Sequence, residues 1–218
     1  MVMKVYGSMI STATLRVLVC LAEKDIDFEL IHVDLASGEH KKPHLLSINP
    51  FGQIPAVEDG DFKLIESRAI MQYIERSYVK QGTDLISKEP KKAAEQSVWM
   101  EVESQKFEPA TTRLVWELCM KRLLFGEKEN QDVVKVKEEA LGSLLDVYEG
   151  RLTENKYLGG DSFSMADLYH VPVIKFLMGT QTKKVFDARP HVSAWVTDIL
   201  SRPSCLKVFC RSGNQLGA

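Results

Sequence analysis

The segment Glu66-Ser67-Arg68-Ala69 places an acid and a hydroxyl directly after a strand-like stretch, where a helix is expected to begin. A helix N-terminus offers free N–H donors and a partial positive charge, so it attracts anions. Ser67 adds a hydroxyl for a carboxylate, and Glu66 adds an acceptor for a nearby ammonium. The segment therefore suits a ligand end that resembles an amino acid. An ordinary capped helix with a surface acid is the alternative interpretation.

Ser11 is the second candidate, because it follows a strand-like segment and opens a predicted helix. One interpretation is a plain N-cap, a role that serine favours. The other is a hydroxyl that donates to a thiolate. A cysteine thiol has a pKa of about 8.5, and a hydrogen bond at a helix N-terminus can lower that pKa by about one or two units. Ser11 would then stabilise a ligand's nucleophile and need no His–Asp partner. Thr12 and Ser8 are the competing hydroxyls.

The elements that position these residues follow a β-α-β and then a β-β-α order, which predicts a parallel strand pair with a right-handed crossover. The predicted strands lie at residues 2–6, 28–33, 54–58 and 62–65, the helices at 11–24 and 66–78, and a short irregular helical piece at 40–47. This order predicts a thioredoxin-like α/β domain over residues 1–79.

After Glu89 the pattern is helical and no convincing strand follows. Helical periodicity covers about residues 90–125, 130–153, 164–178 and 190–200. We therefore predict a linker at 80–89 and an all-helical domain at 90–218. Ser164 and Asp167 fit a capping box, with Asp in place of the usual Glu, and we interpret this motif as structural.

Composition narrows the function classes. The chain has 218 residues, of which 44% are hydrophobic, and a net charge of −2 with a pI of about 6.2, which argues against a nucleic-acid binder. No apolar run approaches the ~20 residues of a membrane span. The first residues lead directly into a strand, so we expect no signal peptide.

The cysteines bear on metal binding and on the cellular compartment of the protein. The four cysteines, Cys20, Cys119, Cys205 and Cys210, lack the spacing of a zinc site, so no metal is expected. Cys20 is expected to be buried packing, and Cys205 and Cys210 are expected to be exposed. Reduced thiols in a chain without a leader predict the cytosol.

Several motifs occur together in one order. They are Lys4-Val5-Tyr6-Gly7-Ser8-Met9-Ile10-Ser11, Gly38-Glu39-His40-Lys41-Lys42-Pro43, Asn49-Pro50-Phe51-Gly52-Gln53-Ile54-Pro55 and Glu66-Ser67-Arg68-Ala69-Ile70. At this spacing the chain resembles the plant glutathione S-transferases of the phi class. Phe163-Ser164-Met165-Ala166-Asp167-Leu168 is similar to the capping motif of the same superfamily. The resemblance runs from about Met3 to about Phe209.

The resemblance implies the glutathione transferase fold, a homodimer and glutathione as co-substrate. It implies that Ser11 is catalytic and that the glutathione-binding residues are His40, Lys41, Gln53, Ile54, Pro55, Glu66, Ser67 and Arg68. Within this set, the resemblance assigns the glycyl carboxylate to His40, Lys41 and Gln53. It also implies a cis Ile54–Pro55 bond, whose exposed main chain pairs with the cysteinyl part of glutathione.

An acceptor pocket is also implied, lined by apolar side chains. Trp116 and Met120 lie one helical turn apart on the same face, and Thr12 and Leu35 are expected to join them. Plain core packing is the alternative for Trp116 and Met120. Leu15 replaces an arginine that is frequent in the family, and we expect this change to affect the surface.

The implied activity is conjugation of the glutathione thiolate to electrophilic hydrophobic small molecules, as in detoxification, with reduction of organic hydroperoxides as a second use of the thiolate. The alternative is a non-catalytic carrier of flavonoids or hormones on the same fold. A thiol transferase or dehydroascorbate reductase would need a cysteine where Ser11 stands. A scaffold or translation-factor domain would usually carry further domains.

Overall fold

The computed structural model describes residues 2–212, which form two compact units. The first unit contains the chain up to Asp84 together with helix α12 (Pro203–Ser212), and the second contains Leu85–Arg202. The predicted boundaries 1–79, 80–89 and 90–218 differ from these units chiefly in α12. That helix packs on α1 (Thr12–Glu23) of the first unit, because its buried face, including Cys205, needs an apolar partner.

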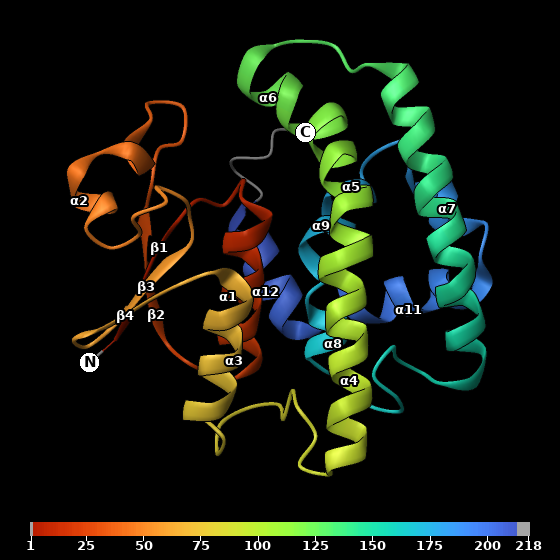
Figure 1. Ribbon diagram of the computed structural model, residues 1–218, viewed down its shortest axis with the longest axis horizontal. Coiled ribbons are helices and arrows are strands. Elements are labelled where there is room, and N and C mark those ends of the chain that lie inside the picture. The colour runs from red at the N-terminus through yellow and green to blue at the C-terminus, as the bar shows by residue number, and fades with distance from the viewer. Residues whose placement is uncertain (1, 213–218) are drawn as a thin grey trace. The chain divides into compact units, whose positions relative to one another are not determined.

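The first unit is built on a four-stranded mixed sheet. Its elements are β1 (Met3–Gly7), α1 (Thr12–Glu23), β2 (Phe28–His32), a 3₁₀ turn (Glu39–Lys41), α2 (Pro43–Leu46), β3 (Ala56–Asp59), β4 (Phe62–Ile65) and α3 (Ser67–Ser77). The strand order is β2-β1-β3-β4; β1 is parallel to β2, whereas β3 is antiparallel to both of its neighbours. Figure 1 shows the sheet between α2 on one side and α1 and α3 on the other. The predicted α/β order is confirmed.

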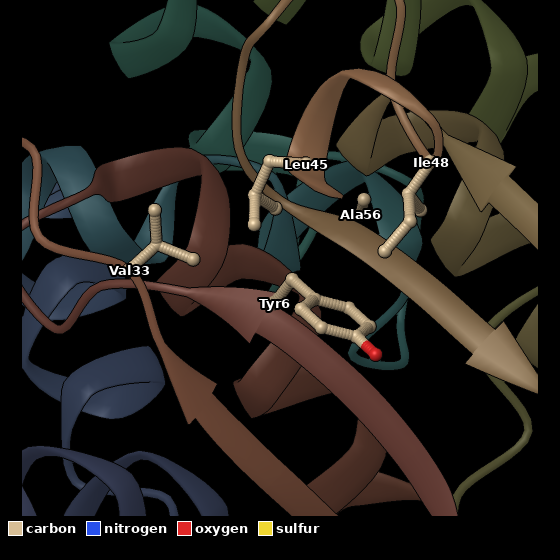
Figure 2. Packing of buried hydrophobic residues seen from close by; sticks show 5 residues of the cluster. All are labelled: Tyr6, Val33, Leu45, Ile48 and Ala56. Carbon is tan, nitrogen blue, oxygen red and sulfur yellow. The ribbon is translucent and has the colours of Figure 1, made fainter. Parts of the chain in front are cut away.

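Alternation along β1 and β3 gives the sheet two apolar faces. Tyr6 pairs with Ala56, and both belong to a buried cluster with Val33, Leu45 and Ile48, shown in Figure 2. The neighbouring Val5–Val57 pair points to the opposite face, because successive side chains of a strand alternate. Both faces are therefore covered, which fixes the register of the sheet.

A buried polar cluster fixes the C-terminal end of α1. Glu23 accepts hydrogen bonds from the hydroxyls of Thr83 and Ser204, and the ammonium of Lys24 lies 3.0 Å from Glu75 and 3.0 Å from the carbonyl oxygen of Thr83. These contacts hold the chain leaving α3, and helix α12, against α1.

Cys205 lies beside Ser204 and is buried, so the expectation that it is exposed is wrong, while Cys210 is exposed.

The second unit consists of helices joined by loops, with one isolated β-bridge between Tyr157 and Gly160 among its described residues. Its α-helices are α4 (Pro90–Val102), α5 (Glu108–Val115), α6 (Lys121–Phe125), α7 (Gln131–Glu154), α8 (Met165–Leu168), α9 (Val171–Leu177), α10 (Lys183–Asp187) and α11 (Pro190–Leu200). The helical segments predicted from the sequence are present, but α10 and α12 were missed.

Two predicted helices contain irregularities. The run 90–125 is continuous but includes π-helical turns at Glu103–Phe107 and Trp116–Met120. The first turn precedes Pro109, which has no N–H to donate to the preceding turn. The run 164–178 is divided into α8 and α9. Pro172 stands in the first turn of α9, where the missing N–H of a proline breaks no helical hydrogen bond.

The predicted capping box at the start of α8 is confirmed. Asp167 is fully buried, and its two carboxylate oxygens accept four hydrogen bonds. Oδ1 accepts from the N–H of Leu158 at 2.9 Å and from the indole of Trp195 at 3.0 Å. Oδ2 accepts from the N–H and the hydroxyl of Ser164, both at 3.0 Å. Burial raises the pKa of Asp167 to about 6, although these donors oppose the rise.

Asp167→Asn is expected to destabilise the second unit. An asparagine keeps one oxygen, so its amide nitrogen would face one pair of buried donors, and each unsatisfied donor costs ~1–3 kcal/mol. We expect the free energy of unfolding in urea to fall by ~2–5 kcal/mol. Asp198→Asn is the matched control, because Asp198 accepts from the Tyr157 hydroxyl at a partly exposed position. Equal losses in the two variants would contradict this role of Asp167.

Candidate functional site

The sheet register brings the candidate segments of the first unit to one end of the sheet. Gly7, which ends β1, pairs with His32 at the end of the parallel β2. Ala56, which begins β3, pairs with Tyr6 and also with Ile65 at the end of β4. The chain therefore leaves β1 toward Ser11, leaves β2 toward His40, enters β3 from Pro55 and leaves β4 toward Glu66 at the same end.

Ser11 is the N-cap of α1. Its hydroxyl oxygen accepts the N–H of Thr14 at 3.2 Å, and its carbonyl accepts the N–H of Leu15 at 2.9 Å. A hydroxyl has one proton to donate besides its acceptor lone pairs. The capping bond uses only an acceptor position, so the Ser11 proton remains available for a ligand. Capping and donation are therefore compatible at Ser11.

The loop before β3 is shaped by Asn49 and Gly52. The buried Asn49 side chain accepts from the N–H of Phe51 at 3.0 Å and donates to the carbonyl of Gln53 at 2.7 Å. Gly52 has φ 55°, and a Cβ there would lie 2.7 Å from a side-chain carbon of Lys41. Lys41 itself donates to the carbonyl of Phe51 at 3.0 Å. These contacts hold the two loops side by side.

His40 and Ile54 lie in these two loops. The Nδ1 atom of His40 is buried and has no hydrogen-bond partner among the described residues. The Ile54–Pro55 bond is cis, as the resemblance implied. The Ile54 side chain is half-buried and packs against the buried cluster that contains Tyr6 and Ala56. Gln53 and Lys41 are exposed.

Glu66 and Ser67 stand at the start of α3, as predicted. Glu66 is exposed, and its carboxylate does not cap the helix. Its backbone has φ 66° and ψ 108°, a conformation that is strained for a residue with a side chain. Ser67 is buried and occupies the first helical position, and Arg68 is half-buried beside it. Such strain is characteristic of functional sites.

Sequence reasoning missed Arg16. This residue is completely buried on α1, and its guanidinium Nη1 donates to the Ser67 hydroxyl oxygen at 3.0 Å. The available signal was a single cation inside the apolar run from Leu15 to Val19, since arginine is rarely buried without a partner. The neighbouring Leu15 is also buried, so the expectation that it affects the surface is wrong.

The remaining predicted residues are distributed over both units. Thr12 begins α1 and Leu35 lies in the turn after β2, and both are half-buried. Trp116 and Met120 belong to the second unit, where they bound the π-helical turn and are half-buried. The Trp116 ring lies 5.9 Å from the ring of Phe125, centroid to centroid. π-Helical turns occur frequently at functional sites.

A buried acid secures this π-helical turn. Glu117 accepts the N–H of Asn130 at 2.9 Å and pairs with Arg113 at 2.7 Å and Lys121 at 3.5 Å. The hydrogen bond from Asn130 and the two cations keep the pKa of Glu117 below its usual value. The turn that carries Trp116 and Met120 is thereby tied to the segment that starts α7.

Cys20 and the metal-binding side chains of the described residues add no further candidate site. Cys20 is buried, as predicted, and burial followed by the charge of Glu75 raises the pKa of its thiol, so it is an inert packing residue. Within residues 2–212, no three metal-binding side chains gather as a metal site would need. The described helices include none with the length and apolarity that a bilayer crossing requires.

Comparisons with known proteins identify the family of this chain. Residues 1–76 match the family model described as glutathione S-transferase, N-terminal domain, and residues 100–203 match that of the C-terminal domain. Glutathione S-transferase APIC of Nicotiana tabacum is 58% identical over 95% of this chain and 97% of its own. The crystal structure of glutathione transferase F7 from Populus trichocarpa is 48% identical, with a TM-score of 0.93 over 97% of this chain and 100% of that one.

A third comparison adds a bound ligand. The structure of glutathione S-transferase-I with lactoylglutathione is 40% identical, with a TM-score of 0.90 over 96% of this chain and 99% of that one. The chain therefore belongs to the glutathione S-transferase family, and the predicted fold and the resemblance to the plant phi class are confirmed.

Proposed function

We propose that this enzyme conjugates the glutathione thiolate to electrophilic hydrophobic small molecules. The observation that carries the proposal is the convergence of Ser11, His40, Pro55 and Ser67 at one end of the sheet, which follows from the strand register. A solved relative is bound to lactoylglutathione, which supports glutathione as the co-substrate.

Ser11 is our candidate for the catalytic residue. Its oxygen already accepts the N–H of Thr14, so its proton is free to donate to the glutathione sulfur. The N-terminal N–H groups of α1 add a partial positive charge that favours the thiolate over the thiol. Lowering the thiol pKa by two units from about 8.5 makes the thiolate the majority species near pH 7.

The two ends of glutathione differ in charge, because the glycyl end is a carboxylate and the γ-glutamyl end carries both a carboxylate and an ammonium. We assign the glycyl carboxylate to His40, Lys41 and Gln53, which supply a cation and polar donors. The buried Nδ1 of His40 supports this assignment, because a buried polar atom without a partner is unusual and a ligand atom would satisfy it. The Ile54 main chain next to Pro55 is our candidate partner for the cysteinyl amide groups, since its side chain is occupied by packing.

The γ-glutamyl end is assigned to the start of α3. Its carboxylate is expected on the N–H groups and hydroxyl of Ser67, and its ammonium on the exposed carboxylate of Glu66. Arg68 lies in the same first turn and completes the set. The strained backbone of Glu66 supports a functional role at this point.

Trp116 and Met120 are our candidates for the wall that holds the acceptor, together with the predicted Thr12 and Leu35. Their half-burial and their place on a π-helical turn support a ligand role over plain core packing. The same thiolate would also reduce organic hydroperoxides. The names of the relatives favour catalysis over the carrier alternative.

The proposal also covers the assembly and the location of the enzyme. We expect a homodimer from the resemblance to the family. We place the enzyme in the cytosol, because Cys20, Cys119, Cys205 and Cys210 are all free thiols.

Ser11→Ala is expected to lower kcat/KM at pH 7 by ~3–25-fold, because raising the thiol pKa by one to two units from ~6.5 reduces the thiolate fraction from ~75% to between ~25% and ~3%. The kinetic pKa of bound glutathione should rise toward its free value in a pH–rate profile. Ser11→Gly is the control for capping, since glycine costs a helix N-terminus only a few tenths of a kcal/mol. Wild-type activity in Ser11→Gly would show that Ser11 is only a cap.

Glu66→Ala and Ser67→Ala are expected to raise the KM for glutathione about tenfold or more, with a smaller change in kcat, because each removes a charge-assisted contact worth ~1.5–3 kcal/mol far from the sulfur. Steady-state kinetics with glutathione varied would show the split. Equal retention of wild type and both variants on a glutathione resin would exclude the assignment.

Trp116→Ala is expected to change the ranking of acceptors by kcat/KM while the KM for glutathione stays nearly constant. An indole contributes ~150–250 Å² of apolar contact, so large flat acceptors should lose most. Trp99→Ala is the matched control. Trp99 is also half-buried, but its ring packs on the Tyr148 ring, with the two centroids 5.4 Å apart, and it is not proposed to contact the acceptor. If Trp116 is core, every acceptor is affected alike and stability falls by ~3–5 kcal/mol.

A further inference from the structure

The guanidinium of Arg16 lies directly behind the Ser67 hydroxyl. Arg16 has 0% of its surface exposed and Ser67 has 6%, and the donor–acceptor distance is 3.0 Å. Arg16 belongs to α1 and Ser67 to α3, two helices that pack on each other. The contact therefore joins a buried cation to the first residue of the helix whose N-terminus is the proposed γ-glutamyl site.

The chemistry of the two groups fixes the direction of the hydrogen bond. A guanidinium only donates, so the Ser67 oxygen must be the acceptor. The single proton of Ser67 then cannot point back to Arg16 and is left to donate elsewhere. A nearby positive charge also polarises the O–H bond, which makes the hydroxyl a better donor to an anion.

Burial strengthens the effect. The charge of Arg16 acts through the protein interior, where screening is weaker than in water. It adds to the partial positive charge at the N-terminus of α3. A carboxylate at this N-terminus would therefore meet a pre-oriented hydroxyl and a fixed positive potential, whereas a neutral group would gain neither in full.

We propose that Arg16 is a positioning residue for glutathione, which acts through the Ser67 hydroxyl to select a carboxylate at the γ-glutamyl end. This inference rests on the proposed role of Ser67. Arg16 itself contacts no ligand in this scheme. Its role differs from that of the exposed Glu66, which is expected to meet the ammonium directly.

A double-mutant cycle between Arg16→Gln and Ser67→Ala tests the proposal. The dissociation constant of glutathione is measured by calorimetry, and again for an analogue in which the γ-glutamyl α-carboxylate is an amide. We expect Arg16→Gln to weaken glutathione about tenfold, ~1.4 kcal/mol, and the amide analogue far less. In the Ser67→Ala background the same change should have little further effect, because the shared hydroxyl is absent. Arg16→Lys, which keeps a cationic donor, should recover part of the loss.

Lys24→Gln is the matched control. Lys24 is another completely buried cation, which follows the last residue of α1 and pairs with Glu75. Its loss should lower stability without changing the preference for the carboxylate over the amide. Losses from Arg16→Gln that are equal for the two ligands, or that simply add to those from Ser67→Ala, would overturn the proposal.

The outcomes separate this inference from the function on which it rests. If Ser67→Ala leaves glutathione affinity unchanged, the proposed γ-glutamyl site is wrong. If Ser67→Ala weakens binding but Arg16→Gln does not, only the role of Arg16 is wrong. Should the Arg16 variants not fold, the guanidinium Nε–H signal of Arg16 is followed by NMR in the unsubstituted protein and in Ser67→Ala. A shift on adding glutathione that is lost in Ser67→Ala supports the proposal, and an unshifted signal in the unsubstituted protein overturns it.

Discussion

The hydrogen bonds between β1 and β3 run antiparallel, whereas those between β1 and β2 run parallel. As a consequence, β1 and β2 end where β3 begins, and β4 returns to the same place because it is antiparallel to β3. Segments that are far apart in the sequence thus emerge together at one end of the sheet. The register is held by the pairs Tyr6–Ala56 and Val5–Val57, which are buried on opposite faces. A slip of one residue would turn both pairs to the wrong face and separate the site segments.

Serine serves two purposes at this end of the sheet. At Ser11 the oxygen accepts a helix N–H, and at Ser67 it accepts from a buried guanidinium. In both cases a protein donor occupies an acceptor position of the hydroxyl, and the hydroxyl proton takes no part in that bond. At Ser11, capping the helix and the proposed donation to a ligand are therefore compatible roles of one hydroxyl. The capping bond orients the Ser11 hydroxyl, which would reduce the entropy cost of ordering it when a ligand binds.

The sequence predicted the parts of the molecule that depend on local pattern. The β-α-β order, the capping box at Ser164 and the start of α3, predicted at Glu66 and observed at Ser67, follow from periodicity and cap chemistry. The π-helical turn before Pro109 was missed, because a helical pattern does not show where hydrogen bonds shift by one residue. Arg16 was missed because its partner is remote in the sequence, and α12 because its apolar face has meaning only against α1.

The backbone of Glu66 illustrates how such a site is maintained. A conformation of this kind costs ~1–3 kcal/mol and persists only when its surroundings over-determine it. Before Glu66, Ile65 is fixed by its pairing with Ala56. After it, Ser67 is fixed by Arg16, and the Glu66 carbonyl accepts the first helical N–H from Ile70 at 2.9 Å. Both neighbours are thus held by contacts that do not involve the Glu66 side chain. That side chain is consequently free of structural duties, and its exposed carboxylate can be committed to a ligand without weakening the fold.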